Sequence, residues 1–274
     1  MTAQHDKAVA FRALHRRDSA FIIPNPWDLG AARLFEQLGF EALATTSSGF
    51  AQTQGRLDQG LSREQVLAHC RALCQSSPLP ISADLENGFG DDPTTVAETI
   101  ALGAAAGLVG GSIEDYCPDD GGRIYSLDHA VERVHAAVEA ARTLDVPFTL
   151  TARAENLIRG VLDIDDCIRR LQAFEAVGAD VLYAPGLATL DQVQLVADAV
   201  TAPLNVLATP LHHCSVAELA AHGAKRISIG GSLARVVLAT MLDAAREMLS
   251  SGTFRWAEHM ASRDDIERVL GPRS

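Results

Sequence analysis

The chain alternates eight times between a short apolar run and a longer amphipathic stretch. The short runs are rich in Val, Ile, Leu and Ala and almost continuously apolar, as expected of strands buried on both faces. We predict strands at 21–24, 42–46, 81–85, 108–113, 148–152, 181–184, 204–208 and 227–229. The stretches between them predict helices at 27–38, from 62 onward, and at 93–106, 127–144, 164–177, 190–199, 216–222 and 233–249.

Eight strand-helix units in strict alternation favour an α/β fold of the (β/α)8 TIM barrel type over a doubly wound open sheet. The glycine fingerprint G-x-G-x-x-G, typical of such open sheets, is missing after the first strand. The 274 residues suit one barrel, and no Pro- or Ser-rich linker divides them, so we expect a single domain over 1–274. Residues 1–20 are predicted to form an N-terminal helix, and residues 250–274 a partly helical C-terminal tail.

The charge balance limits the partners of the chain. Lys and Arg number 23 against 35 acidic residues, a net charge of −12, which argues against nucleic acid or an anionic membrane surface. No apolar run reaches the roughly 18 residues that a membrane span needs, and the N-terminus lacks the pattern of a signal peptide. Five cysteines without zinc-type spacing fit reduced thiols. We therefore expect a cytoplasmic protein.

Three carboxylates follow neighbouring strands where each strand ends. Asp84 and Glu86 close the third predicted strand, and Glu114 follows the fourth. Active sites of such barrels lie at these C-terminal ends, and converging carboxylates repel one another unless a cation or protons compensate. Asp84 and Glu86 are two residues apart, so a straight strand would direct both to one side. Oxygen ligands without His or Cys favour Mg2+, with Mn2+ possible. The alternative is that Asp84 or Glu86 caps a helix or pairs with Arg153.

Arg153 ends the fifth predicted strand, where a guanidinium suits bidentate capture of a carboxylate or phosphonate. The alternative is a structural ion pair with Glu155 or Glu114. The far end of a small anionic substrate could bind to the hydroxyl-rich turn after the second strand, Thr46, Ser47 and Ser48.

Six segments together resemble one protein family. They are TTSSGFA (45–51), SADLENGFGDDP (82–93), SIED (112–115), LTARAENLIRG (150–160), GADVLYAPGL (178–187) and RISIGGSLAR (226–235). Through them the chain resembles the isocitrate lyase/phosphoenolpyruvate mutase superfamily along nearly its whole length, in particular its methylisocitrate lyase-like and phosphonomutase-like members.

The resemblance implies an α/β barrel, usually a homotetramer that exchanges a C-terminal helix between subunits, with Mg2+ binding a 2-oxo acid or its enolate. It implies that Asp84 is the direct metal ligand and that Glu86 and Glu114 act partly through water. It places Asp58 on a conserved acid of the loop after the second strand. It also implies substrate contacts from Thr46, Ser47, Ser48, Arg153 and Asn205. Asp58, Glu114 and Arg153 are the catalytic candidates on this basis.

The loop at 116–125 departs from the family pattern. The lyases carry a Lys-Lys/Arg-Cys-Gly-His segment there, and phosphonopyruvate-type enzymes carry a Lys and an Asn. This chain has Cys117, a further catalytic candidate, without those neighbours. The loop therefore matches neither activity. The resemblance as a whole favours a Mg2+-dependent carbon–carbon lyase or hydrolase acting on a small 2-oxo or 2-hydroxy di- or tricarboxylate. Phosphorus–carbon chemistry on a phosphonate such as phosphonopyruvate, and a non-catalytic barrel that binds 2-oxo acids, are the alternatives.

Overall fold

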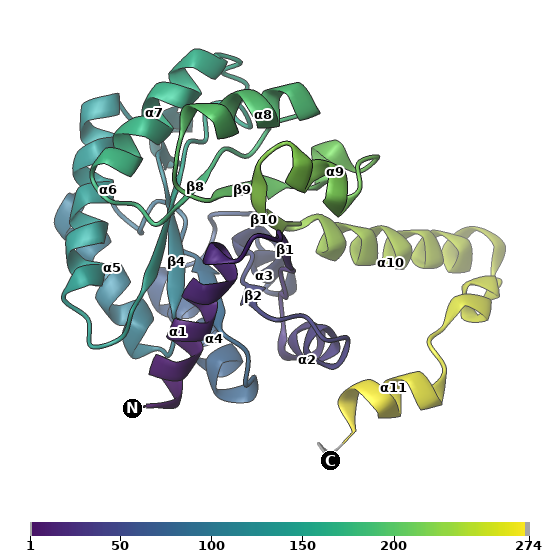
Figure 1. Ribbon diagram of the computed structural model, residues 1–274. Coiled ribbons are helices and arrows are strands. Elements are labelled where there is room, and N and C mark those ends of the chain that lie inside the picture. The colour runs from purple at the N-terminus through teal and green to yellow at the C-terminus, as the bar shows by residue number, and fades with distance from the viewer. Residues whose placement is uncertain (1, 272–274) are drawn as a thin grey trace.

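Eight parallel strands follow one another around a barrel in the computed structural model, which describes residues 2–271 (Figure 1). They are β1 (Phe21–Ile23), β2 (Leu43–Ala44), β3 (Ile81–Asp84), β4 (Gly110–Glu114), β7 (Thr149–Arg153), β8 (Val181–Tyr183), β9 (Leu204–Leu207) and β10 (Ala224–Ser228). Their hydrogen-bonded order is β1-β10-β9-β8-β7-β4-β3-β2. The predicted (β/α)8 barrel is confirmed. Met1 and residues 272–274 lie outside the described residues, and the single domain over 1–274 stays a prediction.

The eighth strand begins three residues earlier than the apolar pattern predicted. The predicted strand starts at Ile227, whereas β10 starts at Ala224. The difference arises because Lys225 and Arg226 interrupt the apolar run although both belong to the strand. Arg226 is buried inside the molecule.

The barrel is closed between β1 and β2 by the chain that follows β1. The Ala44 N–H donates to the Pro24 carbonyl at 3.0 Å. The Asn25 side chain donates to the Thr45 carbonyl at 3.1 Å and accepts the N–H groups of Ile229 and Gly230, both at 2.9 Å. One buried amide therefore joins the ends of β1, β2 and β10.

Helices cover the outside of the barrel, as Figure 1 shows. They are α2 (Leu29–Gln37), α4 (Arg63–Ser76), α5 (Pro93–Ala105), α6 (Leu127–Arg142), α7 (Ile164–Ala176), α8 (Leu190–Ala199) and α9 (Val216–Ala221). A capping box begins α4, where Ser62 and Gln65 each accept a backbone N–H of the other residue.

The predicted N-terminal helix, α1 (Ala3–Arg16), packs against the N-terminal ends of the strands. Phe11 is fully buried there together with Phe21 and Val109. The Arg12 guanidinium donates to the Phe148 carbonyl at 3.2 Å, just before β7. This end of the barrel is therefore filled by apolar side chains.

Two short insertions lie near the C-terminal ends of the strands. The segment interpreted as a turn after β2 forms a helix, α3 (Ser47–Thr53), because the Thr46 hydroxyl accepts the Gly49 N–H and caps it. The loop at 116–125 forms an antiparallel hairpin of β5 (Tyr116–Cys117) and β6 (Arg123–Ile124) around the single turn η1 (Asp119–Gly121). A further turn, η2 (Thr209–Leu211), follows β9.

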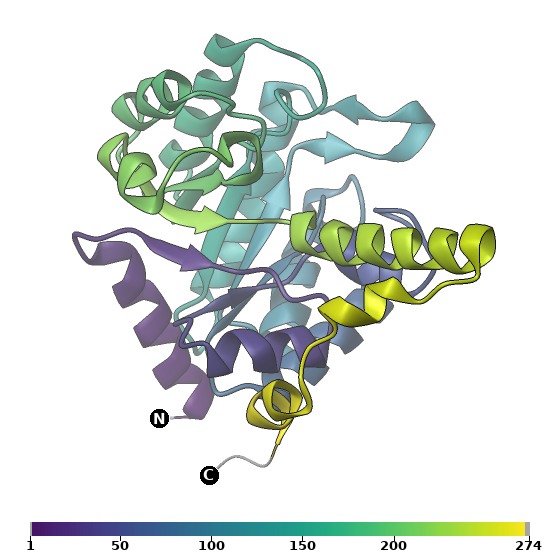
Figure 2. The same ribbon diagram turned by 90° about the vertical axis from the view of Figure 1, so that its right-hand side faces the viewer.

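The last helices extend away from the barrel (Figures 1 and 2). They are α10 (Ser232–Ser251), the turn η3 (Arg255–His259) and α11 (Arg263–Leu270), so the predicted tail is partly helical. Ala234 is the only buried residue of α10. α11 returns to α2, where Arg33 donates to the Gly271 carbonyl at 2.6 Å. No helix of residues 2–271 combines the length and apolarity that crossing a membrane requires.

Because Phe11 is fully buried between α1 and the strand starts, we expect Phe11→Ala to lower the free energy of unfolding by about 3–5 kcal/mol. Val9 lies on the same helix but is half exposed, so Val9→Ala should change it by less than about 0.5 kcal/mol. Urea unfolding followed by circular dichroism measures both. Equal effects of the two substitutions would show that α1 is not part of the cooperative core.

Candidate active site

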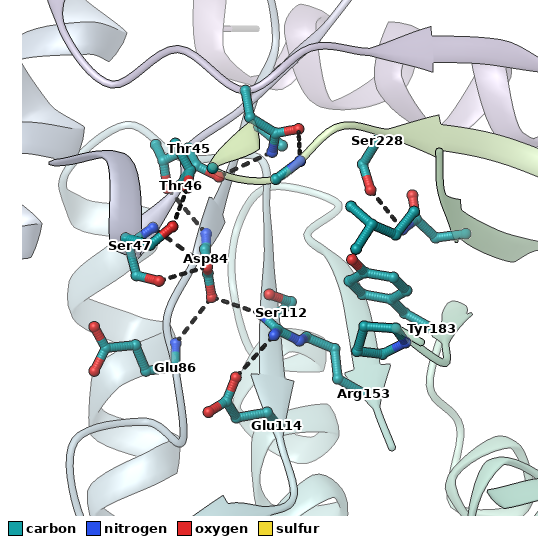
Figure 3. Close-up of a pocket in the computed structure, with 18 of the residues that line it drawn as sticks. Thr45, Thr46, Ser47, Asp84, Glu86, Ser112, Glu114, Arg153, Tyr183 and Ser228 are labelled. Atoms are coloured by element: carbon teal, nitrogen blue, oxygen red, sulfur yellow. Dashed lines mark hydrogen bonds and ion pairs between the residues drawn. The ribbon is translucent and has the colours of Figure 1, made fainter. Parts of the chain in front are cut away.

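A polar cavity of about 210 Å³ opens at the C-terminal ends of the strands (Figure 3). Every predicted site residue except one lines it: Thr46, Ser47, Ser48, Asp58, Asp84, Glu86, Glu114, Arg153 and Asn205. The exception is Cys117, which lies outside the cavity lining. The structure therefore brings together residues that are up to 159 positions apart, from Thr46 to Asn205.

Arg153 is the centre of the cavity's charges. Its guanidinium lies 2.8 Å from Asp84 Oδ1, 3.0 Å from Glu114 Oε2 and 2.8 Å from Glu155 Oε1. Burial acts to lower the pKa of Arg153, but the three carboxylates outweigh burial and hold it well above its usual value. The structure therefore shows the ion pairs that the sequence left open as the alternative role of Arg153.

Asp84 is oriented by the start of α3. Its Oδ2 accepts the Ser47 N–H at 3.3 Å and lies 2.9 Å from Ser47 Oγ, while its own N–H donates to Thr45 Oγ1. Ser47 Oγ is also 2.9 Å from Asp58 Oδ1. A hydroxyl has one proton to donate, so it satisfies one of the two carboxylates at a time. Burial and the charge of Asp84 raise the pKa of Asp58.

Glu86 corrects the expectation of a straight strand. β3 ends at Asp84, and Glu86 has a left-handed backbone with φ of +51°. Its carboxylate consequently turns away from Arg153 instead of projecting beside Asp84 (Figure 3). Burial, followed by the charges of Asp84 and Asp58, raises the pKa of Glu86 to about 8.

Backbone strain is concentrated around this cavity. The non-glycine residues with positive φ within residues 2–271 are Gln59, Glu86 and Phe89. Gln59 and Glu86 line the cavity, and Phe89 lies three residues beyond Glu86. Such conformations cost of order 1–3 kcal/mol each and cluster at functional sites. Gln59 uses its position to donate to Glu114 Oε1 at 3.0 Å.

Glu114 and Glu155 are both almost completely buried. Burial, followed by the charge of Glu155, raises the pKa of Glu114 well above its usual value. Arg159 lies 3.6 Å from each of the two carboxylates. Glu155 is thus a functional candidate that the sequence indicated only as an ion-pair partner.

Asp115 lies outside the cavity and holds Glu155 in position. Its Oδ1 accepts the Glu155 N–H at 2.7 Å, and its Oδ2 pairs with Arg170 at 3.0 Å. Burial raises the pKa of Asp115 to about 6, although the Glu155 N–H and Arg170 counteract the shift. The acidic pair that ends β4 therefore has two roles, since Glu114 faces the cavity and Asp115 positions the chain after β7.

The donor set of the cavity suits a hard divalent cation. Five carboxylates line the cavity, Asp58, Asp84, Glu86, Glu114 and Glu155. Arg153 and Arg159 form ion pairs with three of them, Asp84, Glu114 and Glu155. Burial, followed by the charge of a neighbouring carboxylate, raises the pKa of Asp58, Glu86 and Glu114. A bound cation would counteract these shifts. Oxygen donors of this kind, without His or Cys in the lining, fit Mg2+ or Mn2+.

The carboxylates do not form a ready-made cage of direct ligands. Within the described residues, the His, Cys, Asp or Glu group whose ligand atoms lie within 4.8 Å of one another is Asp91, Cys117 and Asp119, outside the cavity. Arg153 lies between Asp84 and Glu114 instead. The arrangement fits a cation held by one carboxylate directly and by others through water, which is usual for Mg2+.

The hairpin is fixed on the side of the 87–92 loop. The Tyr125 hydroxyl donates to Asp91 and accepts from Asn87 Nδ2 at 3.1 Å. Buried Cys117 directs its Sγ to Asp91 Oδ1 at 3.4 Å, not into the cavity. Buried Arg133 donates to the carbonyls of this loop, including Gly90 at 2.5 Å. The role predicted for Cys117 therefore lacks geometric support in this conformation.

Comparison with known proteins gives consistent matches. The sequence model of a family described as "Phosphoenolpyruvate phosphomutase" matches residues 11–249. An oxaloacetate decarboxylase of Paraburkholderia xenovorans is 30% identical over 271 residues, covering 95% of this chain and 88% of the relative. The 2-methylisocitrate lyase of Escherichia coli is 31% identical over 222 residues, covering 76% and 73%. A crystal structure from Burkholderia cenocepacia J2315, described as a lyase/mutase of unproven activity, is 52% identical with a TM-score of 0.95 and covers 99% and 98%.

The raised pKa of Glu86 predicts how stability depends on pH in the metal-free protein. Between the unfolded pKa near 4.5 and the folded pKa of about 8, the folded chain retains a proton that the unfolded chain has lost. The contribution of Glu86 to the free energy of unfolding is fully present below pH 4.5. It is lost progressively as the pH rises to about 8. The side chain of Gln in Glu86→Gln cannot ionise, so the variant avoids this loss. In EDTA, the melting temperature of the variant minus that of wild type should therefore increase from pH 5 to pH 8.5.

Glu139→Gln is the matched control, because the Glu139 side chain is 57% exposed and its ion-pair partner, Arg142, keeps its charge over this pH range. Its melting temperature should differ from wild type by the same small amount at every pH. Parallel pH curves for wild type and Glu86→Gln would contradict the prediction.

Proposed function

The chain belongs to the phosphoenolpyruvate phosphomutase family, within the isocitrate lyase/phosphoenolpyruvate mutase superfamily, and we propose that it is a Mg2+-dependent lyase cleaving a carbon–carbon bond in a small 2-oxo or 2-hydroxy di- or tricarboxylate. The observation that carries the proposal is the undercompensated carboxylate cluster at the ends of β3, β4 and β7. The names of the two curated relatives refer to oxaloacetate and 2-methylisocitrate, which are compounds of this class.

In this proposal Asp84 is the direct metal ligand, and Glu86 and Glu114 bind the ion through water. When bound, Mg2+ supplies Lewis-acid stabilisation of the negative charge that develops on the substrate's 2-oxygen as the bond breaks. Asp84 suits this role because the Ser47 N–H and the Glu86 N–H hold its carboxylate in place. Buried Glu114 is fixed in the same way by Gln59.

The chain's own groups orient the substrate. The hydroxyls of Thr46, Ser47 and Ser48 lie at the start of α3 and face the cavity, where they can hold the carboxylate next to the reacting carbon. Arg153, once a cation shares its carboxylates, contributes N–H donors from the opposite side (Figure 3). Asp58, whose pKa is raised, can hold or release a proton at its Oδ1 beside Ser47.

The hairpin helps to exclude water from the reacting groups. The Tyr116 ring lies 3.7 Å from the Arg159 guanidinium carbon, and Arg159 in turn lines the cavity. The hairpin lacks the Lys and Asn that phosphonopyruvate-type enzymes carry in this loop. It also lacks the Lys and Gly-His that isocitrate and methylisocitrate lyases carry there. The proton donor of the reaction therefore belongs to the cavity residues in our proposal.

The proposal predicts metal-dependent turnover. Purified protein should consume oxaloacetate, 2-methylisocitrate or a close analogue with Mg2+ and lose activity in EDTA. Asp84→Ala should lose the Mg2+ binding that calorimetry detects in wild type. Its kcat/KM should fall by more than about 100-fold, which is the largest effect usual for residues that only support a metal ligand. Asp165→Asn, an exposed change on α7, is the control and should be fully active. Turnover of phosphonopyruvate alone, or full activity without divalent cation, would contradict the proposal.

We also propose that α10 packs on other copies of this chain, in a homotetramer. Its exposed apolar residues are numerous: Val236, Val237, Leu238, Met241, Leu242, Met248 and Leu249. Figure 1 shows the helix extending beyond the barrel, without a neighbour along most of its length. Such a surface is rarely left exposed to water, and the family resemblance implies a C-terminal helix exchanged between subunits.

This arrangement predicts that the mass in solution depends on α10. Light scattering should give the mass of four chains for wild type, whereas Met241→Asp, at a site 63% exposed, should give a smaller species. Arg246→Gln, on the same helix with a 72% exposed side chain, should stay tetrameric. A monomeric wild type, or an unchanged mass for Met241→Asp, would overturn the proposal.

A further inference from the structure

The interior of the barrel below the carboxylates is polar. The side chains that line this part of the cavity include Ser82, Ser112, Asn205, Arg226 and Ser228. Barrels of this kind usually fill the same region with layers of bulky branched residues. Ser228 and Tyr183 face the cavity from the side opposite Ser47 and Glu86, as Figure 3 shows. The cavity therefore extends from the charged cluster toward β8, β9 and β10.

Arg226 lies in that deeper part. It precedes Ser228 by two residues on β10, so both project inward. Strand pairing places Arg153 beside Tyr183, Tyr183 beside Asn205, and Asn205 beside Arg226. Because barrel strands are tilted, a line of paired residues moves along the barrel axis as it passes around the wall. Arg226 thereby reaches the neighbourhood of His15, on the helix that covers the N-terminal end.

The guanidinium of Arg226 has only neutral partners. Nε donates to Asn205 Oδ1 at 2.8 Å, and Nη2 donates to Thr151 Oγ1 at 3.0 Å. Nη1 lies 3.5 Å from His15 Nε2, which is an acceptor because Nδ1 of the same ring is 2.8 Å from the Phe11 carbonyl. These contacts use three of the five N–H donors of an arginine.

No carboxylate of the described residues forms an ion pair with Arg226 within 4.0 Å. Burial lowers the pKa of Arg226 to about 10, and the Tyr183 phenol is the group that opposes the shift. Of the three arginines in the cavity lining, Arg153 and Arg159 are already paired with carboxylates. A buried charge without a counter-ion is costly, and a ligand anion would compensate it.

From this geometry we infer that Arg226, aided by Asn205 and Ser228, binds the distal carboxylate of the substrate, the one farthest from the metal. The inference rests on the proposed function, because it assumes that the 2-oxygen end of the substrate lies at Asp84. Asn205 Nδ2 already donates to Ser228 Oγ, and its Oδ1 holds the Arg226 Nε–H, so these side chains are fixed before a ligand arrives. Arg226 is then a specificity-determining residue that favours dicarboxylates over monocarboxylates.

The test compares ligands of equal length that differ in one carboxylate. With Mg2+ present, calorimetry measures racemic malate against 2-hydroxybutanoate and 2-oxoglutarate against 2-oxopentanoate. We expect wild type to bind the diacid of at least one pair about ten-fold or more tightly, the effect of one charge-assisted pair. Arg226→Met should abolish that preference without weakening the monoacids, and Arg226→Lys, which keeps the charge, should restore part of it.

Oxalate has no distal group and reports on the metal end alone. If oxalate binds equally to wild type and Arg226→Met while the diacid preference is lost, the inference is supported. If wild type shows no preference in either pair, or if Arg226→Met weakens oxalate and diacids equally, the inference is overturned. Wild-type protein that binds no oxalate with Mg2+ would instead refute the proposed metal site, and a diacid preference dependent on Arg226 would still support the anion site. Should Arg226→Met fail to fold, the wild-type preference and Arg226→Lys decide the question.

Discussion

The contact of one guanidinium, that of Arg153, with three carboxylates determines most of the chemistry of this molecule. Asp84, Glu114 and Glu155 come from the C-terminal ends of β3, β4 and β7, which are neighbours in the sheet although they are separated in the sequence. Burial, followed by the charge of Glu155, raises the pKa of Glu114 although Arg153 and Arg159 both counteract the shift. The carboxylates of the cavity outnumber these two arginines, so the site attracts a cation. The stability of the barrel and the affinity of the site are therefore in opposition, since the excess charge costs folding energy when no cation is bound.

That cost requires support from the surrounding structure. Asn25 joins three strand ends with one buried amide, Asp115 positions Glu155 with the help of Arg170, and Arg133 holds the loop after β3 through its carbonyls. Each support is a polar group buried against backbone atoms, where a missing hydrogen bond is expensive. Such rigid contacts behind the site prevent the carboxylates from moving apart under their mutual repulsion. The carboxylates are thereby pre-organised for a shared cation.

The barrel and the site members could be predicted from sequence because they depend on short-range signals. Strands buried on both faces are visible as apolar runs, and polar residues just after them mark the strand ends. The features that the sequence did not predict depend on three-dimensional detail. The left-handed turn at Glu86 and the helix that starts at Ser47 are set by local hydrogen bonds with little sequence signature. The sequence did not identify Arg226 as a site residue, because a charged residue next to an apolar run resembles a strand boundary. In the structure Arg226 belongs to the strand and its side chain lies inside the barrel.

The anion site proposed at Arg226 offers a reason why a chain with a net charge of −12 could bind an anion. Charges near the mouth pair among themselves, which screens Arg153 from a ligand unless a cation releases it. The guanidinium of Arg226 lies deeper, among neutral hydroxyl and amide groups, and keeps its attraction for an anion because no carboxylate of residues 2–271 pairs with it. A ligand that spans both regions would have one end fixed by the metal and the other by Arg226. Strand tilt makes this separation possible, because residues paired side by side on neighbouring strands come to lie at different depths.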